Sequence, residues 1–178
     1  MIRLKHLFTE ISNNELNRCL KKIKNDQFKL IGAGDNGRVY EIDGEDKLFK
    51  ITQERDEYKV ASIIVNQYSK FTTFIPVYYV DNKNMYIMAN ASKLPNYIKR
   101  SIDNFMFDFS KFARNQGGEV SIFEFASQTN NIDPIVINFI NALQIDINKL
   151  NIPDIELDLD FKSDNIMIWN GKLVMIDW

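Results

Sequence analysis

A glycine-rich segment between two short apolar runs constrains this chain more than any other feature. Gly32, Gly34 and Gly37 fit the pattern G-x-G-x-x-G, and Val39 follows. In dinucleotide-binding folds this pattern opens a helix inside a β-α-β unit, whereas here a β-branched run and a second turn follow it. We therefore predict a strand–turn–strand arrangement, in which glycines let the backbone approach a phosphate chain closely and direct N–H groups at it. A plain glycine-rich hairpin is the alternative.

The hydrophobic pattern of the remaining chain predicts an α+β fold. Alternating runs predict five strands before residue 90, with one helix among them, and helical spacing dominates from residue 94 to residue 145. Two dipeptides, Asp43-Gly44 and Asn170-Gly171, predict tight hairpins. The predicted helices cover 4–25, 54–68, 94–113 and 133–145, and the predicted strands cover 28–31, 38–42, 47–52, 75–80, 85–88, 166–169 and 172–176.

Composition excludes several classes of protein. The chain has 178 residues, a length typical of one domain, and its formal net charge of −2 does not predict a nucleic-acid partner. No apolar run is long enough to span a bilayer, and the polar start does not resemble a secretory signal. One cysteine, Cys19, and one histidine, His6, argue against disulfides, histidine-based zinc sites and Ser-His-Asp catalysis. We expect a cytoplasmic protein without a membrane or nucleic-acid partner, whose oligomeric state the sequence does not indicate.

A lysine in an apolar strand is the second candidate for chemistry. Lys50 lies in Leu48-Phe49-Lys50-Ile51, where an inward-facing ammonium would be costly without anionic partners. A carboxylate on the following helix would supply one such partner, and phosphates another. Glu57 is the better choice than Glu54, because apolar residues at +3, +4 and +7 place Glu57 on the packed face. An edge-strand lysine pointing to water is the alternative.

An oxygen-rich cluster is expected near the C-terminus. Asp160 and Asn165 are five residues apart in a predicted loop, and Asp177 returns on the far strand of the last hairpin. The tight turn should bring Asn165 and Asp177 to the same end of that hairpin. Such a set suits Mg²⁺, which takes few protein carboxylates and completes its shell with phosphate and water. A solvated acidic loop is the alternative.

Together these motifs resemble the protein kinase superfamily. The glycine loop, the strand lysine, the D-x-K-x-x-N segment from Asp160 to Asn165 and the apolar-Asp pair Ile176-Asp177 occur in that family's order and spacing, across about four-fifths of the chain. The form Ser-Asp-Asn-Ile-Met in the loop is most similar to the early protein kinases of podophages related to the T-odd coliphages. The resemblance implies a minimal bilobal fold, with a five-stranded antiparallel sheet and one helix followed by a shortened, mostly helical lobe that carries the catalytic loop and the terminal hairpin.

The resemblance also implies roles for individual residues, with ATP and Mg²⁺ as cofactors. Asp160 would orient the acceptor hydroxyl and accept its proton, Lys162 would neutralise the γ-phosphate, and Glu57 would orient Lys50, which holds the inner phosphates. Asn165 and Asp177 would hold Mg²⁺. Gly32, Gly34 and Gly37 would cover the phosphates. The adenine would lie among Ile31, Val39, Leu48, Met167 and Ile176. The hinge between the lobes would comprise residues 88–91, which begin with Met88 and Ala89.

Two departures from the family pattern shape the expected function. Asp158 and Leu159 stand where a histidine and an arginine usually precede the catalytic aspartate, and an activation segment does not follow Asp177. We expect an N-terminal helical extension at 1–27, an N-lobe at 28–91 and a shortened C-lobe at 92–178. The expected activity is phosphoryl transfer to serine or threonine hydroxyls of host proteins during phage infection. A non-catalytic kinase-like protein that binds and inhibits a host enzyme, and a small-molecule kinase, are the alternatives.

Overall fold

The computed structural model describes residues 11–118, 120–150 and 160–177. It divides into two compact units. Unit 1 comprises residues up to Phe71 together with Ile75–Asn90, and unit 2 comprises Thr72–Phe74 together with the chain from Ala91 onward. The short segment Thr72–Phe74 therefore belongs to unit 2 although its neighbours on both sides belong to unit 1.

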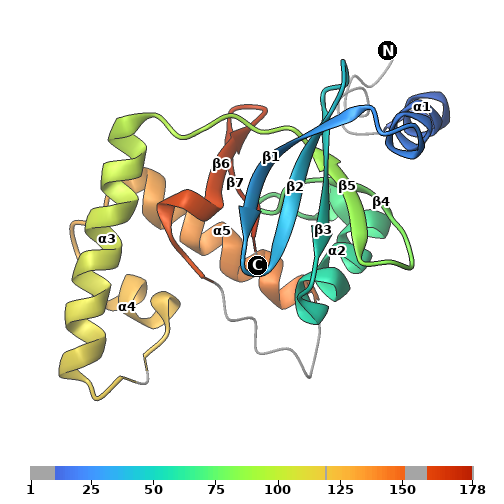
Figure 1. Ribbon diagram of the computed structural model, residues 1–178. Helices are drawn as coiled ribbons and strands as arrows, with labels where there is room; N and C mark the ends of the chain where they lie inside the picture. The colour runs from blue at the N-terminus through green and yellow to red at the C-terminus, as the bar shows by residue number, and fades with distance from the viewer. Residues whose placement is uncertain (1–10, 119, 151–159, 178) are drawn as a thin grey trace, which may run out of the picture. The chain divides into compact units, whose positions relative to one another are not determined.

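Unit 1 is built on an antiparallel sheet of five strands in the order β1-β2-β3-β5-β4 (Figure 1). Every neighbouring pair is antiparallel, and the first three strands follow one another as a meander. Among the described residues of this unit, two α-helices accompany the sheet, one before it and one between β3 and β4. The elements are α1 (Asn13–Lys24), β1 (Phe28–Gly34), β2 (Gly37–Ile42), β3 (Lys47–Thr52), α2 (Arg55–Gln67), the 3₁₀ turn η2 (Tyr68–Lys70), β4 (Val77–Val80) and β5 (Met85–Ala89).

Helix α1 packs on one face of this sheet through an apolar stripe. Leu16, Leu20 and Ile23 contact a cluster centred on Cys19 and Phe49, as the predicted helical spacing requires. Ser12 caps the helix by accepting a hydrogen bond from the Glu15 N–H. The helix begins at Asn13, and residues 4–10 of the predicted helix lie outside the described residues.

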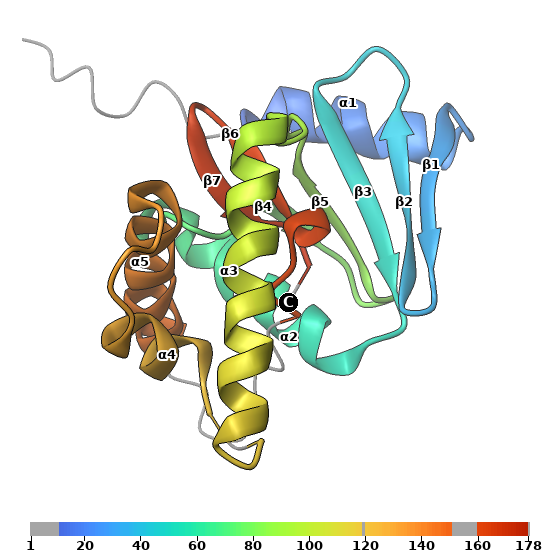
Figure 2. The ribbon, with the colours of Figure 1, turned by 90° about the vertical axis from the view of Figure 1, so that its left-hand side faces the viewer.

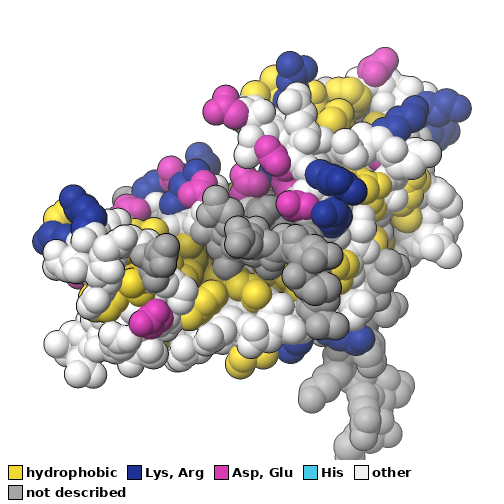
Figure 3. Space-filling view, turned by 90° about the horizontal axis from the view of Figure 1, so that it is seen from below, with side chains coloured by type: hydrophobic (Ala, Val, Ile, Leu, Met, Phe, Trp, Pro, Cys, Tyr) yellow, Lys and Arg dark blue, Asp and Glu magenta, His cyan; other side chains and the backbone are white. Residues whose placement is uncertain are grey.

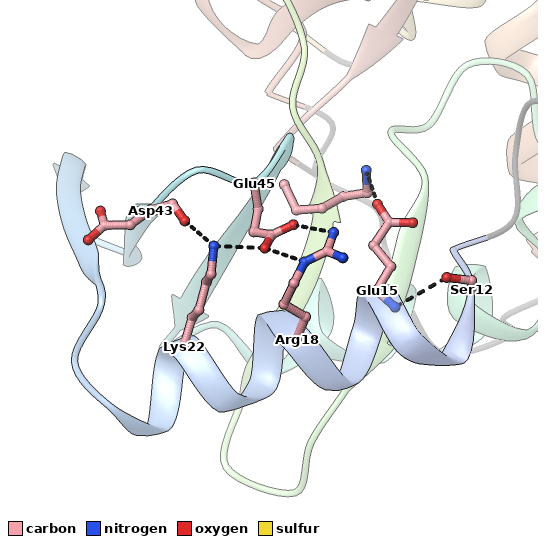
Figure 4. Close-up of polar contacts among 7 residues, drawn as sticks. Ser12, Glu15, Arg18, Lys22, Asp43 and Glu45 are labelled. Carbon is pink, nitrogen blue, oxygen red and sulfur yellow. Dashed lines mark hydrogen bonds and ion pairs between the residues drawn. The ribbon is translucent and has the colours of Figure 1, made fainter.

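The turn between β2 and β3 lies where the sequence predicts it. Four residues, 43–46, join the strands, as the predicted strand ends at 42 and 47 require, and Gly44 has a positive φ of 66°. This turn places Glu45 against α1, where its carboxylate accepts hydrogen bonds from Arg18 at 2.6 and 2.8 Å and pairs with Lys22 at 2.8 Å (Figure 4). The Glu45 side chain is only 4% exposed. These ion pairs therefore attach the β2–β3 turn to α1.

Acid should weaken this attachment of α1. Hydrogen bonds from Arg18 and then Lys22 lower the pKa of Glu45 from 4.5 to about 2. Because the folded pKa lies below the unfolded one, the stabilisation is complete above about pH 4.5 and disappears as the pH falls through about 2. In urea titrations over this range, wild type should lose stability more steeply than Glu45→Gln. Parallel curves for the two proteins would show that the contact contributes nothing.

In its described part, unit 2 combines three α-helices with a two-stranded hairpin (Figure 2). The hairpin turns at Asn170-Gly171, whose φ angles of 49° and 75° are both positive, so the predicted type I′ turn is confirmed. Helix α4 was not predicted as a separate element; Ser121 caps it by accepting from the Glu124 N–H. The elements are α3 (Asn96–Asn115), α4 (Ile122–Gln128), α5 (Pro134–Leu150), the 3₁₀ turn η3 (Ser163–Asn165), β6 (Ile166–Trp169) and β7 (Lys172–Met175).

The predicted fold class is confirmed. The chain is α+β, with a five-stranded antiparallel sheet followed by a mostly helical region and a terminal hairpin, in the order that the kinase resemblance implies. Among the described residues, none of the helices is both long and apolar enough to cross a membrane. On the face shown in Figure 3, acidic and basic side chains are interspersed.

Candidate active site

A buried ion pair joins β3 to α2 in unit 1. Lys50 Nζ lies 2.5 Å from Glu57 Oε1, and the two side chains are 7% and 2% exposed. The sequence left two possibilities for Lys50, an inward-facing lysine with anionic partners and an edge-strand lysine, and the structure shows the first. The spacing of Val60, Ala61 and Ile64, all fully buried, predicted Glu57 to lie on the packed face of α2. The structure thus brings the two residues together as the sequence indicated, and their part in catalysis stays a prediction.

Two further residues hold Glu57, and the sequence did not identify either. The Tyr86 hydroxyl donates to Glu57 Oε1 and the Thr52 hydroxyl donates to Oε2, each at 2.5 Å. Tyr86 stands opposite Lys50 in the β3–β5 ladder, so their side chains share one face of the sheet. Glu57 also lies in the first turn of α2, where the helix dipole favours an anion. The carboxylate is therefore fixed in position and cannot swing away from Lys50 without losing several bonds.

The glycine-rich segment forms the tip of the β1–β2 hairpin. Gly34 pairs with Gly37, so the turn residues are Asp35 and Asn36. A Cβ on Gly37 would lie 2.6 Å from the Ile51 carbonyl oxygen and 3.3 Å from Lys50 Cε, so the fold itself requires glycine there. A Cβ on Gly34 would meet nothing within 4 Å. Protein packing therefore explains Gly37, whereas the space beside Gly34 is open, which fits a backbone that approaches a phosphate.

The predicted adenine and hinge residues of unit 1 lie close to these groups in the sheet. Val39 stands opposite Lys50, and Leu48 stands opposite Met88. Since directly opposed residues of antiparallel strands point to the same face and alternate residues of one strand share a face, Val39, Leu48 and Met88 share the face of Lys50. Ala89 is buried and Ile31 is half exposed, beside the bulge in β1.

In unit 2, the predicted catalytic loop gathers three of its side chains. Asn165 Nδ2 donates to the Asp160 carbonyl oxygen at 2.9 Å and to Asp160 Oδ2 at 3.2 Å, and Lys162 Nζ pairs with the same carboxylate. The contact with Asp160 raises the pKa of Lys162, and the nearby Asp177 charge adds to this, so the ammonium stays protonated. Asp160 and Lys162 are exposed, whereas Asn165 is buried. The loop therefore presents the Asp160 carboxylate and the Lys162 ammonium to solvent, and the buried Asn165 amide holds the carboxylate.

The terminal hairpin aligns Asp177 with this loop. The Ile176 N–H donates to the Asn165 carbonyl oxygen at 3.0 Å, directly after the last pair of the β6–β7 ladder, Ile166 with Met175. Asn165 and Asp177 therefore lie at the same end of the hairpin, as the tight turn predicted. Phe161 anchors the loop in the core of unit 2. The residue is 2% exposed, and its ring centroid lies 6.0 Å from that of Phe105 and 6.1 Å from that of Phe139.

A buried aspartate on α5 supports the strand that leads to Asp177. Asp146 Oδ2 accepts from the backbone N–H groups of Thr72 and Thr73, at 2.6 and 2.9 Å, and from both threonine hydroxyls. The Thr73 carbonyl oxygen in turn accepts from the Met175 N–H at 2.7 Å. Asp146 is fully buried, so it fixes the segment that pairs with the end of β7. Its only signal in the sequence is an acid inside the apolar run Ile145-Asp146-Ile147.

The side chains of Asn165 and Asp177 fit Mg²⁺ that is bound together with a nucleotide. Among the described residues, no group of three or more His, Cys, Asp and Glu side chains could hold a metal ion by itself. Mg²⁺ bound with a nucleotide needs only one or two carboxylates, because phosphate oxygens and water complete its shell. An amide and a carboxylate at one end of the hairpin therefore suit Mg²⁺ accompanied by phosphates rather than a metal held by protein alone.

A pocket in unit 2 contains the two predicted adenine residues of that unit. Its volume is about 420 Å³, and Met167 and Ile176 form part of its wall. At the rim, Lys99 Nζ pairs with Asp164 Oδ1 at 2.5 Å, which lowers the pKa of Asp164 and raises that of Lys99. The other lining residues are Lys93, Leu94, Asn96, Ser163 and Ile166. Asp158 and Leu159, the departures from the kinase pattern, lie outside the described residues.

Comparison with known proteins adds little to this geometry. The sequence matches no protein family and no curated protein. Among solved structures, the ternary complex of streptomycin, ATP and APH(2″)-IIa matches at 15% identity with a TM-score of 0.38, over 96% of this chain and 71% of that chain. A similarity at this level carries no argument about activity, so the function is argued from the residues.

Proposed function

We propose that this protein is a phosphotransferase that moves the γ-phosphoryl group of ATP to serine or threonine hydroxyls of proteins, with host proteins during phage infection as its targets. The observation that carries the proposal is the cluster of Asp160, Lys162 and Asn165, in which the Lys162 ammonium and the Asn165 amide both donate to the Asp160 carboxylate. This combination suits phosphoryl transfer, which needs a group that positions the attacking hydroxyl and charge that stabilises the phosphoryl oxygens.

In the proposed reaction the acceptor oxygen bonds to the γ-phosphorus while the bond from that phosphorus to the ADP oxygen breaks. Asp160 orients the hydroxyl and takes its proton on a carboxylate oxygen. Lys162 Nζ, kept protonated by its neighbours, neutralises the transferred group, and Lys50, oriented by Glu57, binds the inner phosphates. Asn165 and Asp177 would hold Mg²⁺, which supplies further neutralisation of the phosphate charge when bound.

A transfer assay separates this proposal from its alternatives. The protein is incubated with γ-labelled ATP, Mg²⁺ and a bacterial lysate, and the labelled products are separated by size. We expect label in protein bands at phosphoserine or phosphothreonine. Label only in small molecules would identify a small-molecule kinase, and no transfer despite nucleotide binding would favour a non-catalytic binder.

Nucleotide binding should be visible as a thermal shift. A ligand that binds only the folded state stabilises it by mass action, by roughly 3 kcal/mol at one hundred times its Kd, which in a chain of this length corresponds to about 5–10 °C in melting temperature. Mg-ATP should therefore raise the melting temperature of wild type by this amount at saturating concentration.

The Mg²⁺-dependent part of the shift should depend on Asp177. Asp177→Ala removes a proposed ligand at the hairpin end, so this variant should respond equally to ATP with and without Mg²⁺. Asp103→Ala is the matched control, because Asp103 is an exposed acid of the same unit on α3, outside the candidate site. Wild type that shows no shift at millimolar nucleotide would contradict the proposed function.

A further inference from the structure

A second pocket of unit 2, unrelated to the predicted nucleotide residues, lies among α3, α4 and the loop that joins α4 to α5. Its volume is about 350 Å³. One wall is the face of α3 on which Ser101, Phe105 and Asp108 recur at helical spacing. We call it the α3–α4 pocket. Its lining residues are Ser101, Asn104, Phe105, Asp108, Phe125, Thr129, Asn130, Asn131, Ile132 and Asp133.

The charge of the α3–α4 pocket is negative. Among the residues that the structure describes, its lining includes two carboxylates, Asp108 and Asp133, and no Lys, Arg or His. The Ser101 hydroxyl, at 2.6 Å, and the Ile135 N–H, at 2.9 Å, donate to the two oxygens of Asp133 and lower its pKa, so this carboxylate is ionised at neutral pH. A carboxylate accepts about four hydrogen bonds, so Asp133 retains capacity for a further donor. The pocket therefore suits a hydrogen-bond donor with positive charge and disfavours an anion.

Several polar lining groups are available to a ligand. Within the part of the chain that the structure describes, the side chains of Asn104, Asp108, Asn130 and Asn131 form no hydrogen bond or ion pair with protein atoms. All four residues are exposed. Asp108 is thus a pocket-lining carboxylate that pairs with no cation among the described residues, whereas Asp164 of the same unit pairs with Lys99.

The inner part of the pocket is aromatic. Phe105 and Phe125 are 5% and 4% exposed, and their ring centroids lie 5.3 Å apart. Rings of this kind accommodate the methylene stem of a long basic side chain and attract a cation over their faces. Phe105 also packs against Phe161, which directly follows Asp160. The pocket is therefore connected by ring contacts to the loop that carries the proposed catalytic base.

We propose that the α3–α4 pocket binds the guanidinium or ammonium group of an arginine or lysine side chain of the protein substrate. The size supports a single side chain, because about 350 Å³ is near the lower limit of ligand pockets, which run from roughly 300 to 1,000 Å³. The role of the bound protein as a phosphoryl acceptor rests on the proposed function, whereas the binding itself does not.

Binding is tested without nucleotide, by NMR titration of the full chain with N-acetyl-arginine amide. N-acetyl-citrulline amide, which has nearly the same shape and no charge, is the control ligand. We expect the arginine probe to shift amide signals of Phe125, Asn130 and Asn131, and the citrulline probe to leave them in place. Asp108→Asn should raise the Kd of the arginine probe roughly fivefold, which corresponds to the loss of one exposed ion pair.

Asp103→Asn is the matched variant, because Asp103 is an exposed acid on the same helix that does not line the pocket. It should bind the arginine probe as wild type does. Three results would overturn the proposal. The citrulline probe could bind as well as the arginine probe, both variants could weaken binding of the arginine probe equally, or the amide signals that shift could all belong to residues outside the pocket. Tight binding of spermidine together with no binding of the arginine probe would also overturn it, since that identifies a site for free polyamines.

A kinetic experiment then connects the pocket to transfer. For an acceptor peptide that contains arginine, Asp108→Asn should raise KM and leave kcat unchanged, and replacing that arginine with citrulline should abolish the difference between wild type and variant. Probe binding without any phosphoryl transfer would overturn the proposed function and leave the site intact. Transfer that proceeds equally well with arginine and citrulline peptides, in wild type and variant, would overturn the site and leave the function intact.

Discussion

Replacing Asp160 with asparagine is expected to lower phosphoryl transfer by about 100-fold or more, the lower range for loss of a positioned general base. Asparagine keeps the size of the side chain and can still contact Lys162 and Asn165, but it cannot accept the proton of the acceptor hydroxyl. ATP binding should be unchanged, because the proposed nucleotide contacts are made by other residues. The transfer assay measures the first effect and the Mg-ATP thermal shift measures the second.

Two neighbouring acids serve as controls for Asp160. Asp158→Asn, two residues earlier and outside the described residues, should be much milder, because no lysine stands two residues after Asp158 as Lys162 stands after Asp160. Asp164→Asn removes only the exposed pair with Lys99 and should also be mild. A larger loss in Asp158→Asn than in Asp160→Asn would show that the assigned register is wrong and that the role of Lys162 is wrong with it.

Replacing Asp146 with alanine is expected to destabilise the protein by about 3 kcal/mol or more, because breaking a buried charged network leaves its remaining members without partners. Burial acts to raise the pKa of Asp146, but Lys149 and the donors of Thr72 and Thr73 outweigh it, and the pKa is lowered. This stabilisation is therefore present above the unfolded pKa, near 4, and is lost as the pH falls below it. Denaturant titrations at pH 7 measure the difference.

Graded variants distinguish a buried acceptor from a generic core position. Asp146→Asn retains one acceptor oxygen and should lose less stability than Asp146→Ala, while Lys149→Ala removes a partner that is 42% exposed and should cost at most about 1 kcal/mol. Because Thr73 pairs with Met175, Asp146→Asn should also weaken the Mg²⁺-dependent part of the ATP shift. An Asp146→Ala protein as stable as wild type would show that the network does not support the fold.

Local patterns in the sequence were sufficient to predict many parts of this protein. The α+β order, the type I′ turn at Asn170-Gly171 and the burial of Lys50 beside Glu57 follow from residue periodicity and turn chemistry over a few residues. The position of Asn165 beside the end of β7 was also predictable, because a two-residue turn determines which residues of the two strands oppose each other.

Contacts between distant segments were decided only by the tertiary structure. Tyr86 reaches Glu57 because β5 pairs with β3 in a particular register, and Asp146 reaches Thr73, 73 residues away, because α5 packs on that segment. Glu45 likewise meets Arg18 and Lys22 because α1 packs beside the β2–β3 turn. Periodicity tells which face of an element is buried, but it does not tell which partner meets that face, since strand order and helix docking depend on packing of the whole unit.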